Sequence, residues 1–458
     1  MAADLTQADV TDLRERLAQG GISAVELTTA CLNRIEKTEP QLQAWAWLDG
    51  SDALEQARVL DERRKSGAVL GALHGLPVGI KDVIDTGRMP TENGTAIDKG
   101  RVPSEDSGLV ARLRAAGAVI MGKTVTTELA FMEPSKSRNP HDVSRTPGGS
   151  SAGSAVAVAA GMVPLAVGTQ TGGSVIRPAS FCGVVGYKPS FGMIGRSGVL
   201  QQSPFLDTIG VFARSVPGAA LLAEAMAGHD PADPATTQMP APRLYQEALS
   251  ALPGTPRLAL VDLPAPPATD PRMRAALDEL AGFLGDMVER IELPAIFSQA
   301  QQMRTQINQV EMAKYFAGYE RRGRHLMSLK LTEAIDAGKA ILAGDYMAAL
   351  DWREDLNAGL DRIFDRCDAI LCAASPGPAP EGLGSTGDSA FNGIWTLCGT
   401  PVVTLPLFLT RDGLPMGLQI VGRLGDDARL LRIAAWLMQH VGPAGEPTRK
   451  EEMTNAEC

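Results

Sequence analysis

Apolar side chains recur at helical spacing in the first part of the chain. Residues 27–35 follow this pattern, and Ser23 and Glu26 precede it with the spacing of a capping box. A Gly-Gly pair at 20–21 is suited to end an earlier helix, and residues 52–64 form a further helical segment. The N-terminal part of the protein is therefore expected to be helical.

Later in the chain, short apolar runs bounded by glycine or proline predict buried strands. These runs are residues 78–82, 118–121, 164–167, 369–373, 402–407 and 416–421. Helices are expected at residues 107–116, 151–160, 270–286, roughly 297–346 and 428–439. The most apolar stretch, residues 155–167, is too short to span a membrane and contains Gly161 and Pro164, so it is expected to be a core element.

Changes in composition along the chain indicate four segments of one domain. Residues 1–65 are the N-terminal helices, and the glycine-rich residues 66–215 are expected to form the catalytic core. Residues 216–390 contain a proline-rich connection followed by helical patterns, which predicts a variable cover that shapes the substrate pocket. Residues 391–458 are expected to return to the core sheet and to end in a frayed tail at 448–458.

The charge and the cysteines limit the classes of partner and compartment. The 458 residues carry a net charge of −10 without a Lys/Arg-rich run, so neither nucleic acid nor an anionic membrane is an expected partner. The N-terminus lacks the basic and apolar regions of a signal peptide. The six cysteines form no CxxC pair and are expected to be buried, reduced thiols of a cytoplasmic enzyme. The five histidines are scattered, so no metal site is predicted.

Two glycine-rich stretches that contain serine carry the candidate chemistry. Residues 148–154 read Gly-Gly-Ser-Ser-Ala-Gly-Ser, and residues 168–174 read Gly-Thr-Gln-Thr-Gly-Gly-Ser. A nucleophilic serine needs a base, and Lys81 can serve as one if burial keeps it neutral. On this interpretation Ser174 attacks a carbonyl, Ser150 relays the proton to Lys81, and the turn preceding Ser174 supplies backbone amides. Either stretch alone would be better explained as a tight turn with a helix cap.

That turn also predicts an oxyanion hole. The amides of Thr171, Gly172, Gly173 and Ser174 would point at the carbonyl oxygen, and the two glycines would let a substrate approach the backbone closely. Phe131 is a candidate for lining the acyl pocket, although a core aromatic residue fits the pattern better.

Three other motifs suggest different chemistries. Residues 117–124 match the Walker A pattern, but their apolar interior predicts a buried strand instead of a phosphate loop. Ser151 lies in a G-x-S-x-G match, yet no strand is predicted before it, and the required histidine would have to be His440, which has no recognisable setting. No S-x-x-K motif occurs, which disfavours a site of the β-lactamase type.

The chain resembles the amidase signature family. The resemblance rests on the two serine-containing stretches with their upstream lysine, and extends over residues 75–82, 117–124, 146–192, 395–405 and 413–421. It implies that Ser174 is the acyl-forming nucleophile, that Ser150 follows a cis peptide bond, and that Lys81 is the base. It also places Thr169, together with residues 171–173, among the residues that are expected to bind the substrate. The resemblance also implies an α/β fold, a single α/β/α domain with helices on both faces of a mixed sheet, no cofactor, and a possible homodimer.

One departure from the family pattern stands next to the nucleophile. Most members have aspartate four residues before the serine and arginine two residues after it, whereas this chain has Gln170 and Ile176, with Arg177 in the third position. The segment resembles a branch that includes malonamidase-like enzymes, in which this arginine can hold a substrate carboxylate. Arg177 would equally pair with a protein carboxylate. The same departure argues against membership of the tRNA-dependent amidotransferase.

The sequence therefore predicts an enzyme that hydrolyses an amide, carbamate or urea bond of a small molecule. Two alternatives stay open: a catalytically silent binding protein with the same fold, and a glutaminase subunit of the amidotransferase type.

Overall fold

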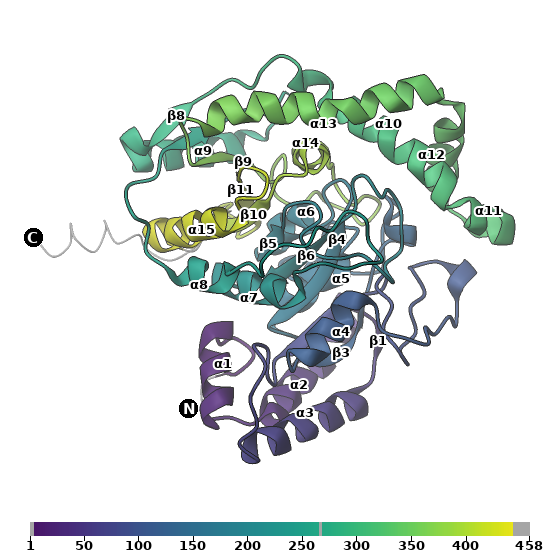
Figure 1. Ribbon diagram of the computed structural model, residues 1–458, viewed down its shortest axis with the longest axis vertical. Helices are drawn as coiled ribbons and strands as arrows, with labels where there is room; N and C mark the ends of the chain where they lie inside the picture. Colours follow the sequence, from purple (N-terminus) through teal and green to yellow (C-terminus); the bar gives the residue numbers. More distant parts are fainter. Residues whose placement is uncertain (1–3, 265–267, 443–458) are drawn as a thin grey trace, which may run out of the picture.

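The structure, a computed structural model, describes residues 4–264 and 268–442. These residues form one mixed sheet of eleven strands, with fifteen α-helices around it (Figure 1). The α/β architecture predicted from the sequence is thus confirmed. The predicted frayed tail at 448–458 lies outside the described residues.

The strands follow the order β1-β3-β2-β4-β6-β5-β10-β11-β9-β7-β8 across the sheet. The pairs β2–β3, β2–β4, β7–β9 and β7–β8 are parallel, and the other neighbours are antiparallel. The strands are β1 Trp45–Leu48, β2 Pro77–Lys81, β3 Val119–Thr124, β4 Leu165–Gln170, β5 Val185–Lys188, β6 Thr208–Ala213, β7 Leu258–Leu260, β8 Val288–Arg290, β9 Ala369–Ala373, β10 Val402–Leu409 and β11 Pro415–Val421.

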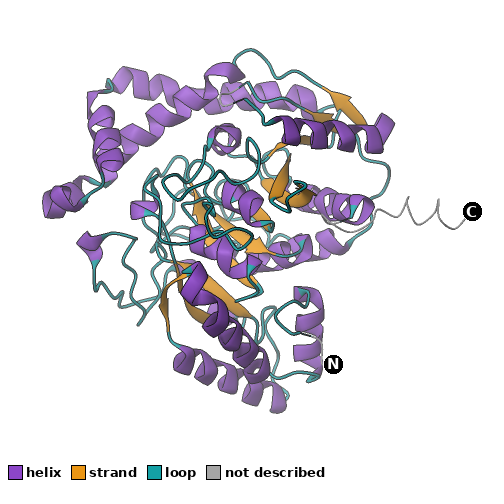
Figure 2. Cartoon of the chain, turned by 180° about the vertical axis from the view of Figure 1, so that it is seen from behind, coloured by secondary structure: helices purple, strands orange, loops and turns teal. Residues whose placement is uncertain are grey.

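Helices cover both faces of the sheet (Figure 2). The helices are α1 Val10–Gln19, α2 Ala24–Leu42, α3 Gly50–Lys65, α4 Gly108–Ala115, α5 Ala152–Ala159, α6 Ile176–Cys182, α7 Val216–Met226, α8 Leu244–Leu249, α9 Pro271–Leu284, α10 Phe297–Tyr315, α11 Ala317–Gly323, α12 Leu329–Ala340, α13 Ala343–Phe364, α14 Ala390–Cys398 and α15 Asp427–Val441. The short helices α5 and α6 pack together against the central strands, and α7 and α15 pack against each other and against β6 and β10.

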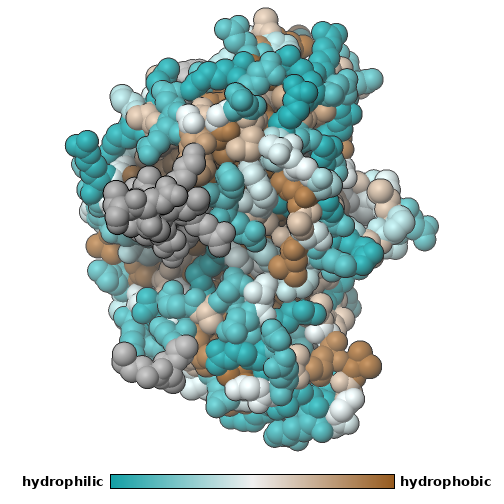
Figure 3. Space-filling view, turned by 90° about the vertical axis from the view of Figure 1, so that its left-hand side faces the viewer, coloured by the Kyte–Doolittle hydropathy of each residue, from teal (hydrophilic) through white to brown (hydrophobic). Residues whose placement is uncertain are grey.

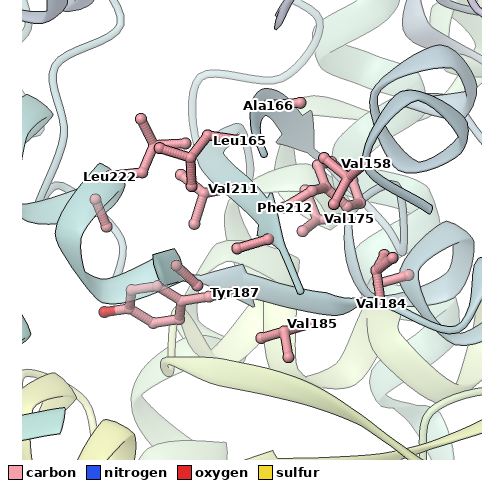
Figure 4. Close-up of a cluster of buried hydrophobic side chains, with 14 of the residues drawn as sticks. Val158, Leu165, Ala166, Val175, Val184, Val185, Tyr187, Val211, Phe212 and Leu222 are labelled. Carbon is pink, nitrogen blue, oxygen red and sulfur yellow. The ribbon is translucent and has the colours of Figure 1, made fainter. Parts of the chain in front are cut away.

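The central strands are buried on both faces, which explains why they read as continuous apolar runs. Figure 4 shows a part of this core, in which Leu165 of β4, Val211 and Phe212 of β6, and Tyr187 of β5 lie in one cluster. All residues of β2, β3 and β4 are buried as well, including the charged Lys81 and Lys123. A charged side chain in such a place needs a specific explanation.

Most predicted elements are present with shifted ends. The capping box before α2 is confirmed by both of its hydrogen bonds, since the Ser23 hydroxyl accepts from the Glu26 amide and the Glu26 carboxylate accepts from the Ser23 amide. The strand predicted at 164–167 continues to Gln170, so Thr169 belongs to β4 and not to the turn that follows. The prediction of one helical stretch over 297–346 is wrong, because the chain breaks there into α10, α11, α12 and the start of α13.

Helices α10 to α13 form one end of the molecule, and α1 to α3 form the other (Figure 1). The region 216–390 also supplies β7, β8 and β9 to the common sheet. On the face seen in Figure 3, the surface is mostly hydrophilic, with hydrophobic side chains in small separate groups. Within the described residues, no helix has the length and apolar character needed to cross a membrane.

Candidate active site

The neighbouring parallel strands β2 and β4 place the candidate residues at their carboxyl ends. Their register pairs Ile80 with Val167, so Lys81 at the end of β2 lies beside the last residues of β4. The turn after β4 carries Ser174, and α6 follows it directly. The carboxyl ends of parallel strands are the usual ligand sites of such sheets.

Lys81 and Ser150 are in direct contact. Lys81 Nζ lies 2.7 Å from Ser150 Oγ and 2.8 Å from Thr169 Oγ1. The peptide bond between Gly149 and Ser150 is cis, as the family resemblance implied. The lysine is fully buried, and this burial lowers the pKa of its ammonium well below the usual range. A neutral amine has one lone pair and two N–H bonds, so it can accept a proton from Ser150 while donating to Thr169.

Ser174 lies in the turn that faces the cavity of the site. Its backbone carbonyl accepts a hydrogen bond of 3.4 Å from the Ser151 amide, which holds the two serine-containing stretches together. The Gly172 carbonyl accepts from the Thr396 hydroxyl at 2.8 Å. Among the described residues, the amides of Gly172, Gly173 and Ser174 donate to no protein acceptor. These three amides are therefore available to a ligand.

The departure at Gln170 has a structural explanation. Its side-chain oxygen accepts from the amides of Val175 and Ile176 at 2.8 and 3.1 Å, and its side-chain nitrogen donates to the Thr396 hydroxyl at 3.0 Å. Ile176 is fully buried. A neutral amide thus fixes the start of α6 by accepting and donating at once, and it needs no arginine partner.

A buried carboxylate, Asp207, holds the turn from the other side. It accepts a hydrogen bond of 2.5 Å from the Thr171 hydroxyl and bonds of 2.9 Å from the amides of Gln202 and Ser203. Burial raises the pKa of Asp207 to about 6 despite these bonds. Its negative charge also opposes the lowering of the Lys81 pKa. Asp207 therefore has two effects: it holds the turn before Ser174 by a hydrogen bond, and its charge acts on the pKa of Lys81.

A cavity of about 500 Å³ opens beside the nucleophile. Its lining combines Ser174 and the glycine turn with Phe131 and Met132 on one side, and with residues of α10 and of the segment before α14 on the other. Arg177 and Arg304 both line it. Arg177 donates to the carbonyl of Gly149 at 2.7 Å and to the hydroxyl of Thr386 at 3.3 Å, and forms no ion pair in the described part of the chain.

The structure also decides between the other motifs. Residues 119–124 form the buried strand β3, and Lys123 Nζ donates to the Ile84 carbonyl and the Thr91 hydroxyl, so this segment is no phosphate loop. The Ser151 hydroxyl bonds to the backbone of Thr169 at 3.1 Å, which leaves it in a structural role. His440 is exposed on α15 and stacks on Trp436.

The structure places Ser150 and Thr169 in contact with Lys81, and it places Thr171, Ser174, Phe131 and Arg177 in the lining of the adjoining cavity. Sequence reasoning missed Asp207 and Arg304. Asp207 precedes β6 with no recognisable motif, and Arg304 is one of many charged residues on the cover helices. A signal for either would have required knowing which elements pack against the turn.

Comparison with known proteins identifies the family. A family model described as Amidase matches residues 26–431, so the chain belongs to the amidase family. It is 34% identical to the glutamyl-tRNA(Gln) amidotransferase A subunit of Chloroflexus aggregans, over 94% of this chain and 96% of that protein. The corresponding protein of Salinispora arenicola is 33% identical, over 97% of this chain and 99% of its own.

Solved structures agree with this assignment. The peptide amidase of Stenotrophomonas maltophilia is 30% identical, with a TM-score of 0.82 over 95% of this chain and 97% of its own. A 6-aminohexanoate cyclic dimer hydrolase is 27% identical, with a TM-score of 0.85 over 96% of this chain and 98% of its own. The protein is accordingly an enzyme of the class that hydrolyses amide bonds, as the sequence predicted. The narrower branch of malonamidase-like enzymes is not confirmed.

Proposed function

We propose that the protein hydrolyses the amide bond of a small molecule through an acyl-enzyme on Ser174, with Ser150 as proton relay and Lys81 as base. The observation that carries the proposal is the buried contact between Lys81 and Ser150 beside a turn with three free amides. Among the described residues Lys81 forms no ion pair, and burying an unpaired ammonium costs several kcal/mol, which favours the neutral amine that a base requires.

The chemistry then follows from the geometry. Neutral Lys81 accepts the proton of Ser150 as Ser150 accepts that of Ser174, and the Ser174 oxygen attacks the carbonyl carbon. The amides of residues 171–174 stabilise the developing oxyanion. The proton returns to the leaving nitrogen, the C–N bond breaks, and the amine departs. Water attacks the acyl ester by the reverse relay and frees Ser174. Thr169 holds the amine of Lys81 in place, while Phe131 and Arg177 bind the acyl side of the substrate.

Labelling with a fluorophosphonate tests the proposal directly. Intact mass spectrometry and peptide mapping of the wild-type protein are expected to place the adduct on Ser174. The adduct should disappear in Ser174→Ala and fall strongly in Lys81→Ala, because the nucleophile then lacks its base. An adduct on Ser151 would contradict the assignment. Ser154→Ala is the matched control, since this serine is buried and bonds the Thr124 side chain and the Val167 carbonyl.

The relay makes a second prediction, which concerns additivity. Lys81→Ala and Ser150→Ala should each lower kcat by roughly 10²- to 10⁴-fold, the usual range for a proton-transfer group. The double variant should be little slower than either single one, because the two residues act as a unit. Steady-state kinetics on any amide that the wild-type protein hydrolyses checks this. Losses that simply multiply would exclude the relay.

A second candidate is supported by the curated relatives, which are amidotransferase A subunits over nearly their full length. On that proposal the Ser174 site would release ammonia from glutamine for a partner protein. Measuring glutaminase activity separates the two. Hydrolysis of glutamine in preference to other amides would favour the amidotransferase role, and hydrolysis of other amides alone would favour the free-standing amidase. A silent binding protein would show neither activity nor labelling.

The setting of the reaction belongs to the proposal as well. The five cysteines of the described residues are free and buried, which supports a reducing compartment and hence the cytoplasm. We further propose that the substrate is a small molecule. We also propose that the protein forms a homodimer, which light scattering would check.

A further inference from the structure

We infer that a small polar cavity beside Thr169 binds one water molecule, and that this water, held by Gln202 and Asp207, fixes the direction in which the Thr169 hydroxyl donates its hydrogen bond. Gln202 is then a positioning residue of the reaction. The inference rests on the proposed function, because it concerns how Lys81 is kept ready to accept a proton. It arises from a second cavity, which is much smaller than the one beside Ser174.

The cavity lies between the adjoining ends of β4 and β6, where Thr169 is paired with Ile209 in the antiparallel register. Both of these residues line it, Asp207 joins them from the segment before β6, and the loop at 199–204 supplies much of the rest. It leaves about 20 Å³ for the centre of a water molecule, and roughly 10–15 Å³ is sufficient for one water. The cavity therefore has the size for a single ordered water and is too small for a substrate.

The Thr169 hydroxyl has a donor that no protein group uses. Its oxygen accepts from Lys81 Nζ at 2.8 Å, and in the part of the chain that the structure describes this is its one hydrogen-bond partner. A hydroxyl carries one O–H donor in addition to its acceptor lone pairs. Thr169 is only 8% exposed, so the bulk solvent does not readily supply the acceptor. The cavity that Thr169 lines is the place from which an acceptor can reach it.

Two groups of the lining have capacity for a further hydrogen bond. Gln202 is 3% exposed, and its Nε2 donates to Asn308 at 3.1 Å, whereas its Oε1 is buried without a partner among the described residues. The Asp207 carboxylate accepts from one hydroxyl and two amides, while an ionised carboxylate offers about four acceptor sites. A water that accepts from Thr169 and donates to Gln202 and Asp207 makes three bonds, the usual number for a buried water.

The direction of the Thr169 hydroxyl matters for the base. The neutral Lys81 amine has one lone pair, and the hydroxyl oxygens of Ser150 and Thr169 lie 2.7 and 2.8 Å from it. If Thr169 donated to this lone pair, the proton of Ser150 would have no acceptor. A water on the far side of Thr169 takes the hydroxyl proton away from Lys81. The hydrogen bonds then run in one direction, from Ser150 through Lys81 and Thr169 to the water.

The charges around the cavity favour this direction. Asp207 supplies the one carboxylate among the described residues of the lining, so the water donates toward it. Arg196 also lines the cavity, but its guanidinium is paired with Asp233 at 2.7 Å and donates to two backbone carbonyls. The carboxylate of Glu311 does not line the cavity and accepts from the loop beside it. Asp207 is thus the group that orients the water.

A crystal structure at a resolution that shows ordered water tests the site directly. In the wild-type protein, a water is expected at about 2.7–3.2 Å from Thr169 Oγ1, Gln202 Oε1 and the Asp207 carboxylate. In Gln202→Met this water should be absent or displaced, because a thioether is only a weak acceptor. A wild-type structure that shows buried waters elsewhere and none in this cavity overturns the inference.

The pH dependence of turnover provides the functional readout. In Gln202→Met the Thr169 hydroxyl is expected to turn toward Lys81 and to donate to its lone pair. Such a bond favours the neutral amine, so the pKa of Lys81 falls, and the acid limb of kcat/KM moves to lower pH by roughly half a unit to one unit. The plateau of kcat should fall roughly 3- to 10-fold, the value of about one hydrogen bond, because the lone pair must first be freed.

Asn308→Ala is the matched control. It removes the partner of Gln202 Nε2 and leaves Oε1 in place. Both residues also line the cavity beside Ser174, so both variants should change KM, but only Gln202→Met should move the acid limb. Equal acid limbs in the two variants overturn the inference, since Gln202 would then have a structural role alone.

Conservative replacement of the hydroxyl completes the test. Thr169→Ser keeps the donor and should retain the wild-type acid limb, whereas Thr169→Val should not. Fluorophosphonate labelling of Ser174 in the same preparations separates two kinds of failure. Labelling of the wild-type protein without the water or the shifted limb contradicts only the water site. Absence of labelling in the wild-type protein contradicts the proposed function, and the crystal structure still decides whether the water is bound.

Discussion

Lys81 owes its chemistry to its position at the end of a fully buried strand. An exposed lysine stays charged at neutral pH and cannot act as a base, whereas burial among β3, β4 and α5 favours the neutral amine. The negative charge of Asp207 opposes this effect. The carboxylate does so while holding Thr171 by a hydrogen bond of 2.5 Å. We interpret Asp207 as a positioning residue, since it acts on the reaction through Lys81 and the turn.

Replacement of Asp207 by asparagine should change the pH dependence of the reaction. The rate requires neutral Lys81, so it rises with pH through the pKa of this lysine. The Asp207 carboxylate favours the charged ammonium, and its removal should lower the Lys81 pKa further. The acid limb of kcat/KM against pH is therefore expected to move to lower pH. The difference in kcat/KM between Asp207→Asn and the wild-type protein should narrow below the Asp207 pKa of about 6, because the wild-type carboxyl is itself protonated there.

Asp427→Asn is the control for this profile. Asp427 is also a buried carboxylate, but its hydrogen-bond partners are Ser190 and Tyr187, and the lysine whose charge acts on it is Lys188. Its acid limb should coincide with that of the wild-type protein. A shift of equal size in both variants, or a shift of the Asp207→Asn limb to higher pH, would contradict the assigned role.

At the scale of elements, the turn between β4 and α6 is fixed by its neighbours. The Gln170 side chain accepts a hydrogen bond from the Val175 amide at the end of the turn, and the Thr396 hydroxyl donates to the Gly172 carbonyl. The side chain of Asn392 of α14 lies directly beside Gly173. A Cβ on Gly173 would lie 2.4 Å from the Asn392 side-chain oxygen. Asn392 cannot yield easily, because its nitrogen donates to the Ala374 carbonyl at 2.8 Å. The glycine is required here by a close approach of side chain to backbone.

Gly173→Ala is thus expected to displace the amides of the turn and to lower kcat by about 10²- to 10³-fold, the usual effect of losing an oxyanion donor. Gly172→Ala is the graded comparison, since its Cβ would lie 3.1 Å from the flexible end of Arg304 and at ordinary contact distance, 3.5 Å, from the Ser389 hydroxyl. It should reduce kcat less than Gly173→Ala. Steady-state kinetics with one amide substrate measures both variants. A larger loss of kcat in Gly172→Ala than in Gly173→Ala would contradict the role of Asn392 in fixing the turn.

The candidate site could be proposed from the sequence more completely than the elements around it. The spacing of the two glycine-rich stretches and the lysine is local and specific, so Lys81, Ser150 and Ser174 could be named without a structure. Strands β5 and β6, by contrast, are short apolar runs with no periodicity of their own. The breaks after α10 and α12 were missed because apolar residues continue across them in helical spacing. Asp207 and Arg304 depend on contacts between distant segments, which no local pattern encodes.

At the scale of the whole molecule, helices α10 and α13 share polar contacts with the loop before β6, near the site. Glu311 of α10 accepts hydrogen bonds from the hydroxyl of Ser203 and from the amide of Phe205, both close to Asp207. It also accepts from the Tyr346 hydroxyl of α13 at 2.9 Å. One buried carboxylate thus joins α10 and α13 to the loop that holds the turn before Ser174.

Glu311→Ala should therefore destabilise the fold and disturb catalysis together. Three donors would lose their acceptor, and each buried donor left without a partner costs about 1–3 kcal/mol. We expect a lower Tm in thermal unfolding and a lower kcat at temperatures where the variant is still folded. Glu333→Ala, at an exposed position of α12, should leave both unchanged. A drop in Tm with an unaltered kcat would limit Glu311 to a structural role.

The pairing of β5 with β10 has a consequence for the synthesis of the protein. The Lys188 amine at the end of β5 donates to the Thr400 carbonyl just before β10, across 212 residues of sequence. At a translation rate of about 5–20 residues per second, this partner emerges from the ribosome roughly 10–40 s later. Until then the edge of β5, beside the helix that follows the nucleophile, has no neighbouring strand and is open to pairing with other chains. The yield of active enzyme in a cell should thus depend on how nascent chains are protected, and not only on the stability of the finished fold.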